Sequence, residues 1–310
     1  MSDFSESQAL HEHRTVGKLA TRTLPDRLFM AGVYLFMVLF SLSILYPFWY
    51  LLVDSFNTPQ ASIRDSVKLW PLEYTLSNYE KVFESGVIGI AYLNSIFKTV
   101  VGTGVILLVS FTAAFGLADH RLPGIKYLTF FMVFTMFFSG GLIPTFLWYK
   151  QLGLLNTRLS WILHLAANAY YIIIMRNFFR EIPQEMTESA TIDGATLYQI
   201  LFRIVVPLST PVVATVTLWA AVQHWNDWFF PLIFTPQRNL TVLQVLLRRV
   251  LIENQVSNEL QMLEQDQVNM VTAETVKAAL LFVSIGPIVA AYPFLQRYFV
   301  KGIMLGSVKG

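Results

Sequence analysis

The chain has 310 residues, of which 55% are hydrophobic and only 14% are charged. Soluble domains carry about 25% charged residues, so this composition indicates a protein whose main solvent is lipid. The net charge of +2 and the scattered basic residues argue against a nucleic-acid-binding protein, which needs a concentrated basic face. Cysteine is absent, which excludes disulfides and thiolate metal sites.

Long, nearly uncharged runs interrupt the polar sequence. A helix that crosses about 30 Å of hydrocarbon needs about 20 mostly apolar residues, and six runs approach or exceed this length. None of them alternates in the way that strands of an outer-membrane barrel do. We therefore predict an all-α membrane protein with six transmembrane helices. The predicted helices cover about residues 28–53, 92–118, 125–148, 159–175, 207–234 and 276–298.

The first run follows several basic residues and so needs to be distinguished from a signal peptide. It extends over residues 28–53, well beyond the roughly 7–15 residues of a signal-peptide core, and no small-x-small cleavage site follows it. We expect it to remain as a membrane span. The predicted organisation is a tail at residues 1–27, a membrane domain at 28–300 and a second tail at 301–310.

The distribution of Lys and Arg predicts the orientation. With an even number of spans both termini lie on one side, and that side carries more Lys and Arg than the other. Cytoplasmic loops are enriched in these residues. We therefore expect a multi-pass protein with both termini in the cytoplasm.

The segment 177–206, between the fourth and fifth predicted spans, is amphipathic. Pro183 suits the first turn of a helix, where a missing N–H costs nothing. Gly194 can adopt the left-handed conformation that ends a helix. Pro207 then starts the fifth span, so two short helices at a turn are predicted to connect to a membrane helix. The apolar face of the second short helix comprises Leu197, Ile200, Leu201 and Ile204, at helical spacing.

This segment resembles the EAA loop of ABC importer permeases, whose pattern is roughly E-A-A, three residues, G, nine residues, I-x-L-P. Ser189 replaces the middle alanine and Val206 replaces the leucine before Pro207. The resemblance implies a cytoplasmic coupling helix that docks into a groove on a partner ATPase. The alternative is an ordinary amphipathic surface helix that ends at glycine. The positions assigned to ATPase coupling are Glu188, Ser189, Ala190, Asp193, Gly194, Ala195 and Pro207.

The two acidic residues of this loop, Glu188 and Asp193, are not interpreted as catalytic acids. We expect them to cap a helix or to pair with basic groups on the ATPase, since carboxylates near a helix end can do either.

The resemblance extends over most of the chain and is closest to the MalG-like carbohydrate permeases, in the LplC/YtcP-like oligosaccharide branch. Matching segments are Tyr46-Pro47-Phe48-Trp49, Leu76-Ser77-Asn78-Tyr79, the run from Trp225 to Trp228, and the ending from Tyr292 to Gly302.

The family implies the type I ABC importer (MetI-like) fold in a bacterial inner membrane. Its implied partners are a second homologous permease, two copies of a cytoplasmic ATPase and an extracytoplasmic sugar-binding protein. ATP and Mg would be bound by the ATPase, so no catalytic residue, cofactor or metal is expected in this chain. The implied function is uptake of oligosaccharides, and the sequence does not indicate which one or whether it is acidic.

A polar group inside a span is costly and often marks a pathway. Near the outer end of the fifth span, such residues alternate with tryptophans that could stack on a sugar ring. Interfacial anchoring and helix packing explain the same residues equally well, and close family members often take their main sugar contacts from the partner permease. The residues predicted to line the substrate path are His224, Trp225, Asn226, Asp227 and Trp228.

Two other function classes remain as alternatives. A secondary transporter driven by an ion gradient would usually show mid-membrane ionisable residues and paired repeats, and neither is visible. A membrane-embedded enzyme would need a His, Asp and Glu cluster at ligand spacing. The chain also lacks the phosphate-cradling Gly-x4-Gly-Lys-Ser/Thr loop, so ATP hydrolysis is assigned to a partner.

Overall fold

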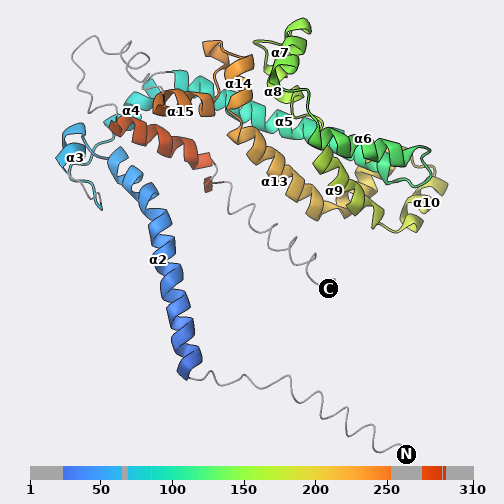
Figure 1. The fold of residues 1–310 in the computed structure, drawn as a ribbon, viewed down its shortest axis with the longest axis horizontal. Helices are drawn as coiled ribbons and strands as arrows, with labels where there is room; N and C mark the ends of the chain where they lie inside the picture. The colour runs from blue at the N-terminus through green and yellow to red at the C-terminus, as the bar shows by residue number, and fades with distance from the viewer. Residues whose placement is uncertain (1–23, 65–68, 85, 253–273, 288, 291–310) are drawn as a thin grey trace, which may run out of the picture. The chain divides into compact units, whose positions relative to one another are not determined.

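A computed structural model describes residues 24–64, 69–84, 86–252, 274–287 and 289–290. Most of the first predicted tail, all of the second and the end of the sixth predicted span therefore lie outside the described residues. The described part is helical apart from turns and one isolated bridge between Asn57 and Tyr74, which confirms the all-α prediction (Figure 1). The chain forms two units, residues 1–51 and 52–310.

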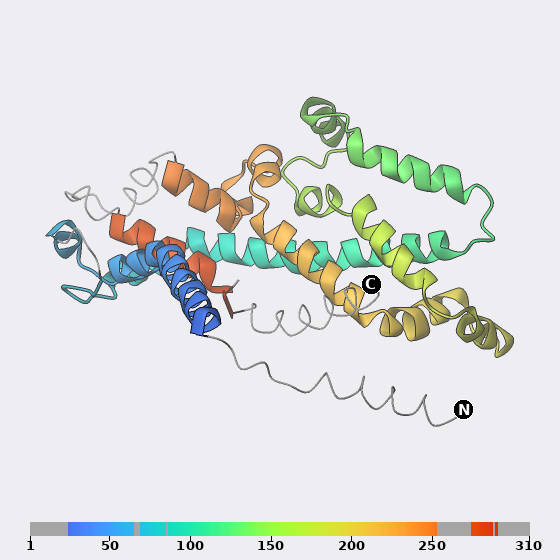
Figure 2. The same cartoon turned by 60° about the horizontal axis from the view of Figure 1, so that its bottom comes forward.

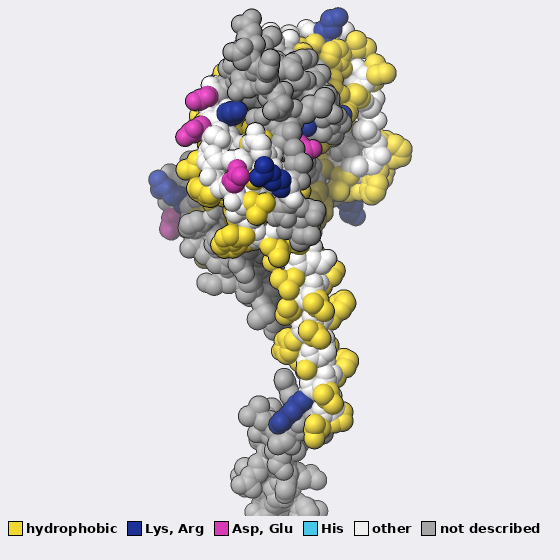
Figure 3. Space-filling model, turned by 90° about the vertical axis from the view of Figure 1, so that its left-hand side faces the viewer, with side chains coloured by type: hydrophobic (Ala, Val, Ile, Leu, Met, Phe, Trp, Pro, Cys, Tyr) yellow, Lys and Arg dark blue, Asp and Glu magenta, His cyan; other side chains and the backbone are white. Residues whose placement is uncertain are grey.

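The first predicted span is a single helix, α2 (Leu24–Ser55). Its 32 residues give a length of about 48 Å at 1.5 Å per residue, more than the hydrocarbon core requires. Hydrophobic side chains such as Leu35 and Phe36 are more than half exposed, and they cover the part of the helix visible in Figure 3. A helix with this apolar surface is suited to lipid or to other membrane helices.

In the second unit, α5 (Val87–Ala118) is the helix along which the others pack. Both α9 (Ala169–Arg180) and α13 (Thr210–Asn226) lie against it (Figure 2). The core between these helices is apolar and includes Ile106 and Met175, which are fully buried. This helix also confirms the second predicted span, and it begins five residues earlier than expected, at Val87.

The third predicted span is broken. Helices α6 (Ile125–Phe137) and α7 (Leu142–Gln151) are bent by 109° relative to each other. The break contains Gly141, whose φ is +83°, a value that L side chains rarely adopt. The break covers residues 138–141, and Gly141 directly precedes the first residue of α7.

The fourth and fifth predicted spans are also divided. Residues 159–175 form α8 (Arg158–Leu163) and the start of α9, and residues 207–234 form α13 and α14 (Phe229–Phe234). The last described helix covers 274–287. By length and composition, two described helices can cross a membrane, or up to four if each bent pair counts as one span.

The polar segment that follows α2 is folded around the buried amide side chains of Asn57 and Asn78. Asn78 donates to the carbonyls of Ser55 and Asn57, both at 2.9 Å, and the Phe56 ring contacts those of Tyr74 and Tyr79. This part contains α3 (Pro59–Arg64) and α4 (Ser77–Glu84). The other short elements are η2 (Arg238–Leu240) and α15 (Leu243–Ile252).

Candidate functional site

The segment assigned to ATPase coupling forms two short helices at a glycine turn, as predicted. The first is α10 (Gln184–Ile192) and the second is α11 (Leu197–Ile200). Gly194 between them has φ +83°, and Thr196 forms a capping box with Gln199 at the start of α11. The turn therefore depends on local chemistry that the sequence displays.

One side of the coupling segment packs on the protein and the other is exposed. Ala190 and Ala195 are partly buried against the core between α5 and α9. Apolar side chains elsewhere on the segment remain exposed, which marks a surface suited to a protein partner. These exposed residues are Met186, Ile192, Leu197 and Tyr198.

Arginines fix the C-terminal end of α5 beside this segment. The Leu117 carbonyl accepts hydrogen bonds from Arg176 Nε at 2.9 Å and from an Arg180 guanidinium nitrogen at 3.3 Å. The last carbonyls of a helix have no partner within it, and cations near them also suit the helix dipole. Because Arg176 and Arg180 lie in α9, which leads into α10, α9 is tied to the end of α5.

A further contact reaches α10 itself. Arg121, in the turn after α5, forms an ion pair with Glu188 at 2.9 Å. Sequence reasoning assigned Glu188 to helix capping or to the ATPase and did not identify Arg121. The two residues are 67 positions apart, and no local pattern relates them.

The prediction that Pro207 starts the fifth span is wrong. It lies in α12 (Val206–Leu208), and α13 begins at Thr210 after a bend of 88°. Proline has no N–H and its ring clashes with the carbonyl four residues earlier. The preceding turn, η1 (Leu201–Val205), is accordingly a wider π-helix, in which Val206 N–H donates to Leu201 O.

The residues predicted to line the substrate path fall into three environments. His224 and Trp225 are buried, Asp227 is mostly buried in an ion pair, and Asn226 and Trp228 are exposed. The structure therefore brings the first three into the helix packing and leaves two accessible in this chain.

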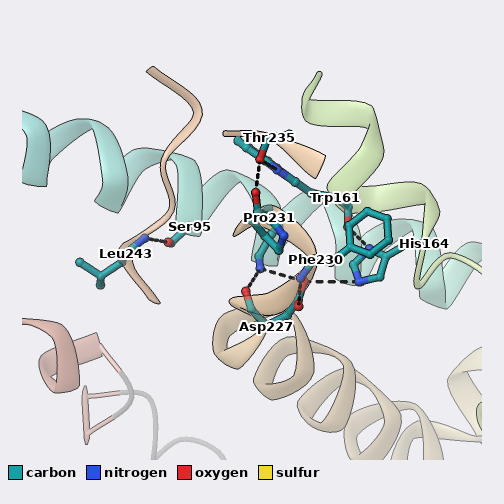
Figure 4. Close-up of polar contacts among 9 residues, drawn as sticks. Ser95, Trp161, His164, Asp227, Phe230, Pro231, Thr235 and Leu243 are labelled. Carbon is teal, nitrogen blue, oxygen red and sulfur yellow. Dashed lines mark hydrogen bonds and ion pairs between the residues drawn. The ribbon is translucent and has the colours of Figure 1, made fainter. Parts of the chain in front are cut away.

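Asp227 lies between two basic side chains. Lys98, only 1% exposed, has its Nζ 3.3 Å from Asp227 Oδ2 and donates to the Asp227 carbonyl. The His164 ring has Nε2 3.3 Å from the same carboxylate oxygen and Nδ1 3.0 Å from Trp161 O, as Figure 4 shows. The two ring nitrogens therefore each lie near an oxygen atom, one of the Asp227 carboxylate and one of the backbone.

Lys98 lies inside the second predicted span, about residues 92–118. The structure buries its amine against Asp227, which lies 129 residues later in the chain. The available signal was the lysine itself, because an ionisable group in a span usually has a partner. The sequence could not identify that partner among distant residues.

His224 sits where α13 crosses α5. A Cβ on Gly102 would lie 2.4 Å from His224 Nε2, so only glycine permits this approach. The Trp225 ring meets Tyr92 edge to face, with centroids 6.3 Å apart. Both predicted path residues therefore contact α5 directly.

Side chains of α5 also hold the segment after Asp227. Asn94 donates to the carbonyls of Asn239 and Thr241 at 2.9 and 3.0 Å, and Leu243 N–H donates to Ser95 Oγ at 2.8 Å. These bonds fix the region of Figure 4 that carries α14 and the start of α15. Among the described residues, no group of three or more His, Asp or Glu side chains could hold a metal ion.

Comparisons with known proteins cover most of the chain. Residues 123–304 match the family model described as "Binding-protein-dependent transport system inner membrane component". The polygalacturonan/rhamnogalacturonan transport system permease protein YtcP of Bacillus subtilis (strain 168) is 39% identical, with 93% of this chain and 100% of the relative covered. Protein LplC of the same organism is 40% identical, with 91% and 93% covered.

A solved structure agrees with these relatives. A crystal structure of a bacterial ABC transporter involved in the import of the acidic polysaccharide alginate contains a chain with a TM-score of 0.83 and 33% identity. The match covers 89% of this chain and 98% of that one. The chain therefore belongs to the family of inner membrane components of binding-protein-dependent transport systems.

Proposed function

We propose that this chain is the permease subunit of an ATP-binding cassette importer that takes up oligosaccharides delivered by an extracytoplasmic binding protein. The relatives that carry this proposal are permeases of sugar transport systems, including a lactose permease protein of Rhizobium radiobacter at 27% identity. Family membership favours this function over transport driven by an ion gradient. The YtcP and lactose relatives are both named as transport system permease proteins.

The coupling segment is the observation that carries the mechanism. It presents exposed apolar residues such as Ile192 and Tyr198 while Ala190 and Ala195 pack against the core. In this proposal, a groove on the ATPase receives the exposed side, and its closure moves α10 together with α9 and α5. ATP and Mg are bound by two copies of that ATPase, and a second homologous permease completes the membrane pathway.

The length of α5 supports an arrangement in which the Lys98–Asp227 ion pair and the coupling segment lie near opposite surfaces of the membrane. Lys98 and Leu117 are separated along the helix by about 28 Å at 1.5 Å per residue, close to the roughly 30 Å of the hydrocarbon core. The ion pair of Lys98 is then near one membrane surface and the coupling segment near the other. With both termini cytoplasmic in a bacterial inner membrane, the coupling segment faces the ATPase.

Asn226 and Trp228 are the members of the predicted substrate path that sugar can reach in this chain, because both are exposed. The Trp228 ring lies under the Arg248 guanidinium at 4.3 Å from its centroid, which fixes the ring in place. We assign these two residues to the path, and His224, Trp225 and Asp227 to the packing that supports it.

The test is reconstitution of the complete transporter, with its ATPase, second permease and binding protein, in proteoliposomes. We expect oligosaccharide uptake that requires ATP, and ATPase activity that rises when loaded binding protein is added. Uptake that persists without ATP and follows an imposed ion gradient would contradict the proposal.

Gly194→Pro tests the coupling segment within the same assay. Proline cannot adopt φ +83°, so the turn is lost and we expect normal membrane insertion with strongly reduced uptake per ATP hydrolysed. Gly153→Pro is the matched control, because Gly153 also has positive φ (+67°). The N–H of Gly153, like that of Gly194, donates to the backbone carbonyl three residues earlier. Equal uncoupling by both variants would contradict the assignment.

A further inference from the structure

We infer that Arg121 is a positioning residue for the coupling helix α10 and that it acts through Glu188. The inference rests on the proposed function, since it concerns how coupling is transmitted. Its basis is the 2.9 Å contact between the Arg121 guanidinium and Glu188 Oε1. This contact joins the turn after α5 to the middle of α10, so movement of α10 reaches α5 without passing through α9.

The position of Arg121 is itself fixed. Its backbone N–H donates to Asp119 Oδ1 at 2.9 Å, which closes the turn directly after α5. Two residues earlier, the Leu117 carbonyl is held by Arg176 and Arg180. Arg121 therefore extends from a helix end that is held by hydrogen bonds, whereas α10 contributes the small side chain of Ala190 to the core.

Other polar side chains of α10 form hydrogen bonds with the backbone of the same helix. Ser189 and Thr191 donate to the backbone carbonyls four residues earlier, those of Glu185 and Thr187. Such bonds stabilise the helix without orienting it against its neighbours. Glu188 differs because its carboxylate reaches another segment, so it can set the direction in which α10 presents its exposed face.

The exposure of the pair defines what it can do. The Arg121 and Glu188 side chains are 74% and 56% exposed, and ion pairs this exposed contribute little to global stability. A weak contact can still shift the balance between orientations of a helix that is lightly attached. Removing the pair should therefore alter coupling while leaving the folded protein intact.

The experiment is a charge exchange in the assembled transporter in proteoliposomes, measuring oligosaccharide uptake per ATP hydrolysed. We expect Arg121→Glu and Glu188→Arg each to lower this ratio by about two- to fivefold, equivalent to about 0.4–1 kcal/mol at 1.4 kcal/mol per tenfold change. The double variant, which restores opposite charges in reversed order, should recover to within about twofold of the original. High salt should lower the ratio of the original protein and of the double variant alike.

Lys126→Glu is the matched control, because Lys126 is an exposed cation close to the same turn and its substitution makes the same charge change. It should leave the ratio unchanged. Thermal melting of each purified variant verifies that the folded protein is retained.

Several results would overturn the inference. If the double variant is as defective as the worse single variant, Glu188 acts on the ATPase and not through Arg121. If neither single variant changes the ratio, or if Lys126→Glu lowers it equally, the ion pair has no specific role. A lack of ATP-dependent uptake by the original protein would instead contradict the proposed function, so the two failures are distinguishable.

Discussion

At the scale of residues, the second unit contains a buried charge pair, Lys98 and Asp227. Lys98 has 1% of its side chain exposed and Asp227 has 15%. Charges removed from water are tolerated when they are paired and when their other hydrogen-bonding groups find partners. His164 and the backbone N–H of Phe230 complete the surroundings of the Asp227 carboxylate, and Lys98 also bonds to the Asp227 carbonyl. The cluster therefore connects α5, α8 and α14 at the point where α13 ends.

This arrangement predicts that Lys98→Met destabilises the protein by about 1–3 kcal/mol, because a buried carbonyl and part of a carboxylate lose their donor. The measurement is thermal unfolding of the purified permease in detergent. When Asp227→Leu is combined with Lys98→Met, the further loss of stability should be smaller than the loss that Asp227→Leu causes alone. The reason is that replacing both members of a buried pair by apolar residues is often nearly neutral. Unchanged melting of Lys98→Met would show that the pair is not important for stability.

At the scale of elements, the crossing of α5 and α13 depends on a missing side chain. Gly102 is buried and a Cβ there would lie within 2.8 Å of three atoms of the His224 ring. Real Cβ atoms do not approach so closely, and His224 is fully buried, so its ring has little room to move. The separation between the two helices is thus set by one glycine and one histidine.

We predict that Gly102→Ala costs about 1–3 kcal/mol, the usual range when extra volume is forced into a packed core. Gly104→Ala provides the control, because Gly104 lies on the same helix and a Cβ added there would meet no atom within 4 Å. Thermal unfolding in detergent compares the two variants, and only Gly102→Ala should melt at a lower temperature. Equal melting of both would mean that α13 can shift without cost.

At the scale of the whole molecule, α5 connects two regions of the second unit. Its first half holds the Asp227 cluster and the segment that carries α14 and α15, and its last turn is held by arginines beside α10. In the proposed mechanism, a rigid helix between the two regions transmits a change at the coupling segment across the thickness of the membrane. The proposed orientation makes this a connection between the cytoplasm and the outer face.

The absence of cysteine makes that orientation directly testable. Gln184→Cys at the start of α10 and Gln237→Cys before η2 both substitute exposed residues. In intact cells, a membrane-impermeant maleimide should label Gln237→Cys, and it should label Gln184→Cys only after the membrane is permeabilised. The original protein is the unlabelled control, and the reverse pattern of labelling would contradict the orientation.

Features that depend on neighbouring residues could be predicted from the sequence. Apolar runs predicted α2 and α5 because the length of a span is set by the thickness of lipid, and Gly194 predicted the turn between α10 and α11 because its φ of +83° is a local requirement. The all-α fold class followed from these patterns, whereas the coupling assignment came from the resemblance of residues 188–207 to the EAA loop of ABC importer permeases.

Tertiary structure alone decided where the predicted spans break and which distant groups meet. Hydrophobicity indicates that a segment prefers lipid, but it does not show that α13 ends at Asn226 or that α6 and α7 are bent by 109°. Lys98 and Asp227 are 129 residues apart, and Arg121 and Glu188 are 67 apart. Such pairs form only when packed helices bring them together, so their physical cause is the three-dimensional fold and not any pattern along the chain.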